Sequence, residues 1–156
     1  MKSKVKTFGI LTSGGDAPGL NAAIRGICKT SILQYNMKPI GIRNGFRGLI
    51  ENDCFELSLN DFSGLLTKGG TILGTSRDKP FKNPEINQKT NLLPIDSIIK
   101  TYESNHMDAL VCLGGNGTNT TANLLSQAGL NVIGLPKTID NDIVKTDITF
   151  GFHTAL

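Results

Sequence analysis

Two aspartates two residues apart, Asp140 and Asp142, are suited to acid–base chemistry and metal binding. They follow a short apolar segment that ends near Pro136, so we expect them just beyond a strand. A carboxylate pair of this kind can supply a general base and a ligand for Mg²⁺. Asp and Asn are also common in solvated turns, and taken alone the pair fits such a turn at least as well.

Two glycine-rich segments have the composition of phosphate-binding loops. Residues 13–19 (SGGDAPG) and 114–118 (GGNGT) each join a strand-like segment to a helix-like one. Glycines at such a junction let backbone N–H groups face a phosphate at the helix N-terminus, where the helix dipole favours negative charge. Either segment alone could be an ordinary tight turn, and the first is neither a Walker A loop nor a GxGxxG fingerprint. Two such loops at one edge of a sheet favour phosphate binding.

A third glycine-rich segment ends in a cation. Residues 69–77 (GGTILGTSR) close on Arg77, whose guanidinium could hold a phosphoryl group, although an ordinary surface arginine is the alternative. His106 and His153 have no partner at a metal-ligand spacing, and we expect both to be structural or exposed. The 3 cysteines form no CxxC pair, and we expect reduced structural thiols without chemistry.

Short apolar segments alternate with longer amphipathic ones and would position these residues. We predict strands at residues 6–12, 37–43, 108–113 and 131–135 and helices at 21–34, 60–67, 94–105 and 119–127. Asn60 or Asp61 is expected near the cap of the short helix. A loop through Gly45 and Gly48 follows the second strand, and residues 69–93 form a long loop. This alternation predicts an α/β fold with an open, mostly parallel, Rossmann-like sheet, helices on both faces, and ligands beyond the carboxyl ends of the strands.

Size and charge exclude several classes of protein. The 156 residues have the length of one domain, and a formal net charge of +3 is too small to indicate a nucleic-acid surface. The longest uninterrupted apolar run, residues 109–113, is too short to span a membrane, so we expect a cytoplasmic protein without membrane or nucleic-acid partners. Residues 150–156 look like the opening of a helix without a C-cap, which predicts the N-terminal part of a longer protein, truncated before a second domain.

Four segments together resemble the phosphofructokinase family. They are residues 14–26 (GGDAPGLNAAIRG), 69–77 (GGTILGTSR), 114–118 (GGNGT) and 136–142 (PKTIDND), in the order and at the separations of that family. The resemblance covers nearly the whole chain but only part of a typical member. It implies that residues 1–156 form an N-terminal domain that binds the phosphoryl donor.

The resemblance also implies a reaction, the glycolytic transfer of a phosphoryl group to O1 of fructose 6-phosphate, giving fructose 1,6-bisphosphate. Asp140 is similar to the base that takes the proton of the 1-hydroxyl group, and Thr138 to a residue that hydrogen-bonds the sugar or the transferred phosphate. Arg77 resembles the cation that steadies the moving phosphoryl group. Such transfer depends on positioning and on neutralising spread negative charge.

By the same resemblance, the donor would be ATP with Mg²⁺, and Phe46 would stand near the adenine. The remaining implied site residues are Gly15, Asp78, Gly115, Asn116, Gly117, Thr118 and Lys137 for the donor, Ile139 beside Thr138 and Asp140 for the sugar phosphate, and Asn116 and Asp142 for the metal. Arg25 and Lys29 resemble the cations of an allosteric effector site, with solvated helix charges as the alternative. The full-length protein is expected to be a homo-oligomer, a dimer or a tetramer.

Two positions depart from the pattern of many members, and the family's sugar-phosphate arginines and histidine, which lie further downstream, are not in this sequence. Asn116 stands where they have Asp, so a metal contact there would carry no charge. Lys137 is typical of members that use pyrophosphate, whereas Gly117 leaves room for a nucleotide and favours ATP. Pyrophosphate-dependent phosphofructokinase and a non-catalytic module that binds phosphate ligands are the alternatives. Lipid and NAD kinases are a weaker one, because they lack the PKTIDND segment.

Overall fold

The computed structural model describes residues 4–15, 19–82, 84–137 and 147. Within this part the chain forms strands, α-helices and two short 3₁₀ helices. In chain order they are β1 (Thr7–Thr12), α1 (Leu20–Tyr35), β2 (Lys38–Ile42), α2 (Phe46–Glu51), β3 (Cys54–Glu56), η1 (Leu59–Phe62), η2 (Leu65–Thr67), α3 (Pro94–Ser104), β4 (Ala109–Gly114), α4 (Asn116–Gln127) and β5 (Val132–Pro136).

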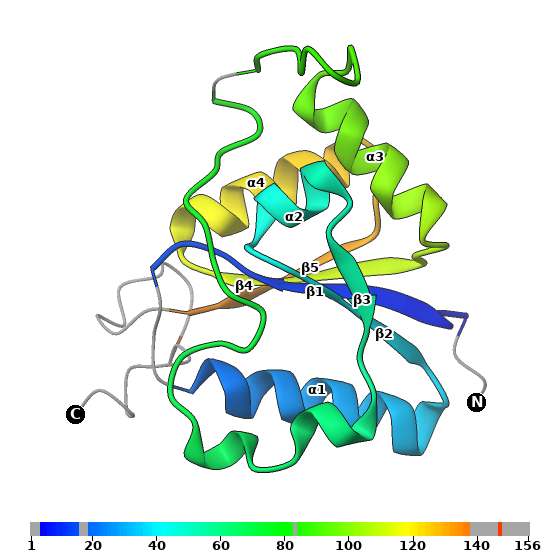
Figure 1. Cartoon of the computed structure of the whole chain (residues 1–156), viewed down its shortest axis with the longest axis vertical. Helices are drawn as coiled ribbons and strands as arrows, with labels where there is room; N and C mark the ends of the chain where they lie inside the picture. Colours follow the sequence, from blue (N-terminus) through cyan, green and yellow to red (C-terminus); the bar gives the residue numbers. More distant parts are fainter. Residues whose placement is uncertain (1–3, 16–18, 83, 138–146, 148–156) are drawn as a thin grey trace.

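The strands form one open sheet in the order β3-β2-β1-β4-β5. β1 pairs in parallel with β2 and β4, and β4 pairs in parallel with β5, whereas β3 is antiparallel to β2. α1 covers one face of the sheet, and α2, α3 and α4 cover the other (Figure 1). The α/β prediction is therefore confirmed, and the carboxyl ends of β1, β2, β4 and β5 lie along one edge.

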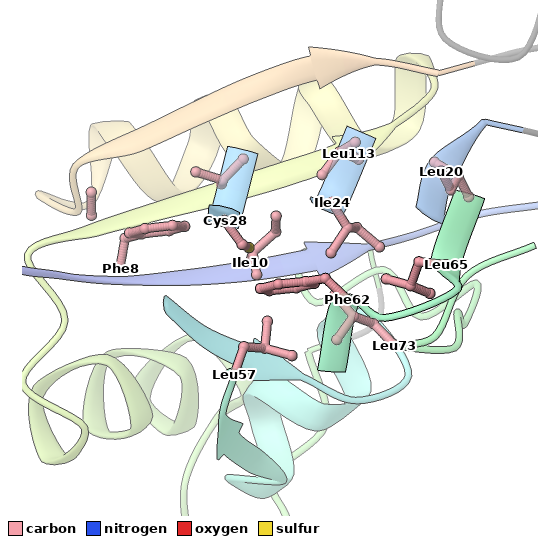
Figure 2. Close-up of a cluster of buried hydrophobic side chains, with 12 residues drawn as sticks. Phe8, Ile10, Leu20, Ile24, Cys28, Leu57, Phe62, Leu65, Leu73 and Leu113 are labelled. Carbon is pink, nitrogen blue, oxygen red and sulfur yellow. The ribbon is translucent and has the colours of Figure 1, made fainter. Parts of the chain in front are cut away.

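Strand residues alternate between two buried clusters, one on each face. On the α1 face, Phe8 and Ile10 of β1 pack with Leu20, Ile24 and Cys28 of α1 (Figure 2). On the opposite face, Leu11 of β1 and Leu110 of β4 pack in a second cluster. This cluster also contains Leu49 of α2, Ile98 of α3 and Leu125 of α4. Because β1 and β4 are buried on both faces, they read as continuous apolar segments. Each buried Leu or Ile stabilises the fold by about 1.5–3 kcal/mol.

The structure differs from the prediction after β2. We expected a loop through Gly45 and Gly48, but α2 begins at Phe46 and includes Gly48. Gly48 is there for space, because a Cβ atom at this position would overlap the carbonyl oxygen of Arg43. The strand β3 was missed as well, because its 3 residues are too few for an alternating pattern.

The short helix predicted at residues 60–67 is also wrong in detail. The segment forms η1 and η2, separated by Ser63 and Gly64. The N-cap is Ser58, and Asp61 lies near it as expected, completing a capping box by accepting hydrogen bonds from the Ser58 backbone N–H (2.7 Å) and hydroxyl (3.2 Å). Residues 69–93 form a long loop as expected, with one isolated bridge between Asn87 and Leu92 among its described residues.

Candidate phosphate-binding site

Two glycine turns lie side by side at the carboxyl ends of β1 and β4. The Ser13 N–H donates to the Leu113 carbonyl oxygen at 2.9 Å and ties the two strand ends together. Gly14 follows with φ +84°, a left-handed conformation that side chains rarely adopt. A Cβ atom at Gly15 would meet no atom within 4 Å, so this turn is open on its outer side.

The second turn leads into α4, whose N-terminus has no cap from a side chain. Gly115 is the N-cap, no side chain accepts a hydrogen bond there, and the first turn holds no acidic residue. The first N–H groups of a helix lack partners within the helix and carry partial positive charge. The start of α4 is thus free of competing anions from its own side chains and suits a phosphate.

The two glycines Gly114 and Gly117 differ in what surrounds them. A Cβ atom at Gly114 would overlap the side chain of Thr118, which is 6% exposed and packs beneath the turn. Thr118 is therefore placed to offer its backbone N–H rather than a projecting side chain. At Gly117 a Cβ atom would meet no atom of the described residues within 4 Å, so packing against them gives no reason for glycine at this position. Asn116 is exposed at the first position of α4.

Buried polar side chains hold the loop segment that leads to Arg77. Asn21, 3% exposed, donates from Nδ2 to the carbonyl oxygens of Lys68 (3.1 Å) and Gly69 (3.2 Å) and accepts from the Ile72 N–H (2.7 Å). Thr12 donates to the Gly74 carbonyl oxygen at 2.7 Å. The segment, drawn in green, runs from the α1 layer across the edge of the sheet toward α3 (Figure 1).

The end of that segment is bonded directly to the first glycine turn. The Gly14 N–H donates to the Ser76 carbonyl oxygen at 2.9 Å, and the Thr75 hydroxyl donates to the Gly14 carbonyl oxygen. Arg77 therefore follows a backbone pinned to the end of β1. Its side chain is exposed and makes no hydrogen bond or ion pair with any residue that the structure describes.

Lys137 adds a second cation at the same edge. Its backbone N–H donates to the Gly114 carbonyl oxygen at 2.9 Å, which extends β5 alongside the second turn. Its side chain is 5% exposed, and the ammonium group donates to the carbonyl oxygen of Gly15. Nζ lies 3.7 Å from the position that a Cβ atom of Gly14 would take. The predicted donor residues Gly15, Arg77, Lys137 and 115–118 thus converge on one edge of the sheet.

Comparison with known proteins identifies this arrangement. The sequence model of the family described as phosphofructokinase matches residues 7–156. The chain belongs to the phosphofructokinase family. It is 62% identical to an ATP-dependent 6-phosphofructokinase of Spirochaeta thermophila, over 97% of this chain and 42% of that protein. It is 60% identical to an ATP-dependent 6-phosphofructokinase of Propionibacterium freudenreichii, over 95% of this chain and 39% of that protein.

A solved structure agrees. The chain resembles the phosphofructokinase of Pichia pastoris in the T-state with a TM-score of 0.82 and 34% sequence identity, over 98% of this chain and 17% of that one. The chain spans about two fifths of the length of the curated relatives it matches, 42% and 39% of the two named above.

Phe46, the expected adenine contact, is buried in the structure, and its contact with adenine stays a prediction. Phe46 is 1% exposed, and its ring lies in the hydrophobic cluster on the α2–α4 face with Leu49 and Ile98. The reason is that α2 starts at Phe46 and turns this ring into the core. The carboxylate of Asp78, an expected donor-binding residue, forms an ion pair with Arg47 of α2.

Several expected site residues lie outside the described part of the chain. These are Thr138, Ile139, Asp140 and Asp142, together with His153 and the helix opening expected at residues 150–156. Among the described residues, no three His, Cys, Asp or Glu side chains gather in a way that would hold a metal ion. Of the two expected metal ligands, only Asn116 is described, and its side chain is exposed at the start of α4.

The cysteines behave as structural thiols. Burial raises the pKa of Cys28 to about 12 and moves that of Cys112 still further up. Burial also raises the pKa of Cys54 to about 11, helped by the charge of Asp53 and opposed by Arg43. All three are free, and none would be a thiolate near neutral pH. None of the described helices has the length and apolar character needed to cross a membrane.

Arg25 and Lys29 lie together, away from the glycine turns. Spaced four residues apart on α1, they line a pocket of about 310 Å³ with residues of the 59–66 segment. The other lining residues are Leu59, Phe62, Ser63, Gly64, Leu65 and Leu66. The two cations therefore share a concave surface, as an effector site would require.

Proposed function

We propose that the protein transfers the γ-phosphoryl group of ATP to O1 of fructose 6-phosphate, forming fructose 1,6-bisphosphate and ADP in glycolysis. The observation that carries the proposal is the exposed guanidinium of Arg77, which has no hydrogen-bond or ion-pair partner among the described residues and follows a backbone bonded through Ser76 to the Gly14 turn. The uncapped start of α4 and the ammonium of Lys137 lie at the same edge of the sheet. The matched relatives named above are ATP-dependent enzymes.

In this proposal the described residues bind the donor. The N–H groups at the start of α4 and the Gly14–Gly15 turn would cradle its phosphates, and Arg77 would neutralise charge on the group in transfer. Open space at Gly117 supports ATP rather than pyrophosphate, because a nucleotide has ribose and an α-phosphate to accommodate. Lys137 does not argue against ATP, since its ammonium is bound by the Gly15 carbonyl oxygen.

The acceptor half of the reaction is assigned to residues carried over from the family pattern. Asp140 takes the proton of the 1-hydroxyl group while O1 forms a bond to the γ-phosphorus and the bridging oxygen leaves with ADP. Thr138 and Ile139 contact the sugar phosphate. Replacing Asp140 with Asn should lower kcat by about 10²–10⁴-fold, with a much smaller change in KM for fructose 6-phosphate.

Mg²⁺ would accompany the donor rather than occupy a protein cage. The described residues offer it one neutral oxygen ligand, the Asn116 side chain, and no carboxylate cluster. That donor set fits an ion that keeps several waters and binds mainly to substrate phosphates. Asp142 is the second proposed ligand, and the ion would neutralise charge on the phosphates.

The pocket beside Arg25 and Lys29 is proposed as a regulatory site for a phosphorylated effector. Two cations in a concave site of about 310 Å³ suit a small anionic ligand. A homo-oligomeric, cytoplasmic protein completes the proposal, following the family resemblance. Sedimentation of the full-length protein tests the oligomer, and activity assayed with and without phosphorylated metabolites tests the regulatory site.

The test of the main proposal is steady-state kinetics of the full-length protein with ATP and, separately, with pyrophosphate. We expect a higher kcat/KM with ATP and fructose 6-phosphate, and only a modest change for Lys137→Gly. A far higher kcat/KM with pyrophosphate, lost in Lys137→Gly, would establish the pyrophosphate-dependent alternative. Saturable binding of ATP without turnover of any sugar phosphate would establish the non-catalytic module.

A further inference from the structure

Arg77 is followed directly by a residue of opposite charge, yet the two do not pair. The carboxylate of Asp78 accepts hydrogen bonds from Arg47, at 3.0 Å from Nε to Oδ2 and at 3.5 Å from the terminal nitrogen to Oδ1. Arg77 itself contacts no acidic side chain within the described residues. Arg47 thus binds the carboxylate of the residue that directly follows the proposed phosphoryl-binding cation.

Arg47 is held in place by the start of α2. Gly45 precedes this helix, and a Cβ atom there would lie 2.9 Å from the Thr12 carbonyl oxygen and 3.3 Å from the Ser76 backbone nitrogen. The first turn of α2 therefore rests against the end of β1 and against the segment that carries Arg77. Phe46, buried in the core, fixes the helix beside Arg47.

Stability does not explain this pair. Both partners are partly exposed, with 56% of the Arg47 side chain and 34% of the Asp78 side chain accessible. Exposed ion pairs contribute little to folding. Charge at the site does explain it, because an unneutralised carboxylate beside Arg77 would repel a polyphosphate and compete for the guanidinium.

We infer that Arg47 is a positioning residue of the donor site, which binds and neutralises Asp78 so that the Arg77 guanidinium stays available to the donor's phosphates. The inference rests on the proposed donor site and adds a residue that the family motifs do not mark. It predicts a charge effect with a definite sign. Removing Arg47 harms donor binding only while Asp78 keeps its charge.

The experiment compares Arg47→Ala, Asp78→Asn, the double variant and Arg43→Ala in the full-length protein. Arg43 is a matched control, because it also pairs with an aspartate (Asp53, 3.3 Å) and is 49% exposed, but its partner is not Asp78 and neither residue of the pair belongs to the segment that carries Arg77. The readouts are KM for ATP, KM for fructose 6-phosphate, kcat, and their dependence on salt.

For Arg47→Ala we expect KM for ATP to rise about three- to tenfold, with KM for fructose 6-phosphate nearly unchanged and a smaller effect at high salt. Asp78→Asn should lower KM for ATP by roughly twofold, because it removes a negative charge and releases Arg47. The double variant should return to within about twofold of the parent, and Arg43→Ala should match the parent.

Two results would overturn the inference. If Asp78→Asn raises KM for ATP as much as Arg47→Ala, and the double variant is no better, the pair anchors the loop and does not act through charge. If Arg47→Ala leaves KM for ATP unchanged, the pair is a surface contact only. Failure of the proposed function is separate, because it would appear as a parent protein without ATP-dependent turnover. Equilibrium binding of ATP to the same four variants would then test the charge effect alone.

Discussion

Glycine has different roles in two glycine-rich segments of this molecule, the one before Arg77 and the one at the start of α4. In the segment before Arg77, Gly74 has φ +70° and a Cβ atom there would lie 2.6 Å from Oδ1 of Asn44, so glycine stabilises the folded segment. In the first turn of α4, a Cβ atom at Gly117 would meet no described atom within 4 Å, so glycine leaves space unfilled. Glycine therefore serves the backbone conformation in the first segment, whereas in the second it leaves room for the proposed donor. Substitutions should therefore separate stability from activity.

The largest effect is expected for Gly117→Asp. An aspartate would project bulk and negative charge toward the donor's phosphates, and we expect kcat/KM with ATP to fall by at least about 100-fold. The fold should be unaffected, because the position is open and an acidic residue near a helix N-terminus is favourable by about 0.3–1 kcal/mol. Donor kinetics and a thermal melt of the same sample check both parts. A lowered Tm would show that the position is structural after all.

Asn21→Ala should have the next largest effect, and it should lower stability, whereas Gly117→Asp lowers activity. The substitution leaves the carbonyl oxygens of Lys68 and Gly69 and the Ile72 N–H without their buried partner. We expect a loss of about 2–3 kcal/mol in the free energy of unfolding. Hydrogen exchange should rise first in the segment that precedes Arg77. Asn119→Ala is a comparison variant, since its amide bonds only within its own turn, to Gly114 and Gly115.

Gly74→Ala is a smaller test of the same segment. A left-handed backbone conformation costs a non-glycine residue about 1–2 kcal/mol, and the contact with Asn44 adds to it. We expect chemical denaturation to show that loss. Gly117→Ala should instead stabilise α4 by roughly 0.5–1 kcal/mol, because alanine favours helix more than glycine does. Equal changes for the two variants would remove the distinction between the segments.

The sequence predicted the parallel sheet, the helices on both of its faces and the convergence of the glycine turns at one edge. Buried parallel strands and glycine clusters can be recognised from short stretches of sequence. It did not predict α2, because Gly48 looks like a turn residue until the carbonyl of Arg43 is seen against it. The resemblance to the family suggested Phe46 as an adenine contact, and nothing in the sequence indicated that α2 buries its ring. A residue's type does not tell which way its helix turns it.

The contacts that hold the site together join residues distant in sequence. Arg47 and Asp78 are 31 residues apart, and Asn21 and Lys68 are 47 apart. No spacing rule along the chain links such pairs. A hint was available for Asn21, because a buried amide in the first turn of a helix must find partners for its donors and acceptor.

The smallest effect is expected at the opposite edge of the sheet, where a carboxylate serves structure alone. Asp108 accepts hydrogen bonds from the backbone N–H groups of Thr7 (3.0 Å) and Lys6 (2.9 Å), which lower its pKa. A lowered pKa means that this stabilisation is present above the ordinary Asp range, near pH 3.9, and is lost as the pH falls through the lowered pKa. Asp108→Asn should therefore melt slightly lower at pH 7 and match the parent in strong acid. A difference that persists in strong acid would contradict the assignment.

The central claim is that the edge formed by the Gly14 turn, the start of α4, Arg77 and Lys137 binds the donor's phosphates. The most direct measurement is a crystal structure of the full-length protein with a non-hydrolysable ATP analogue and Mg²⁺. We predict phosphate oxygens within hydrogen-bonding distance of the first N–H groups of α4 and of the Arg77 guanidinium. An analogue bound only in the pocket beside Arg25 and Lys29, with this edge empty, would contradict the account.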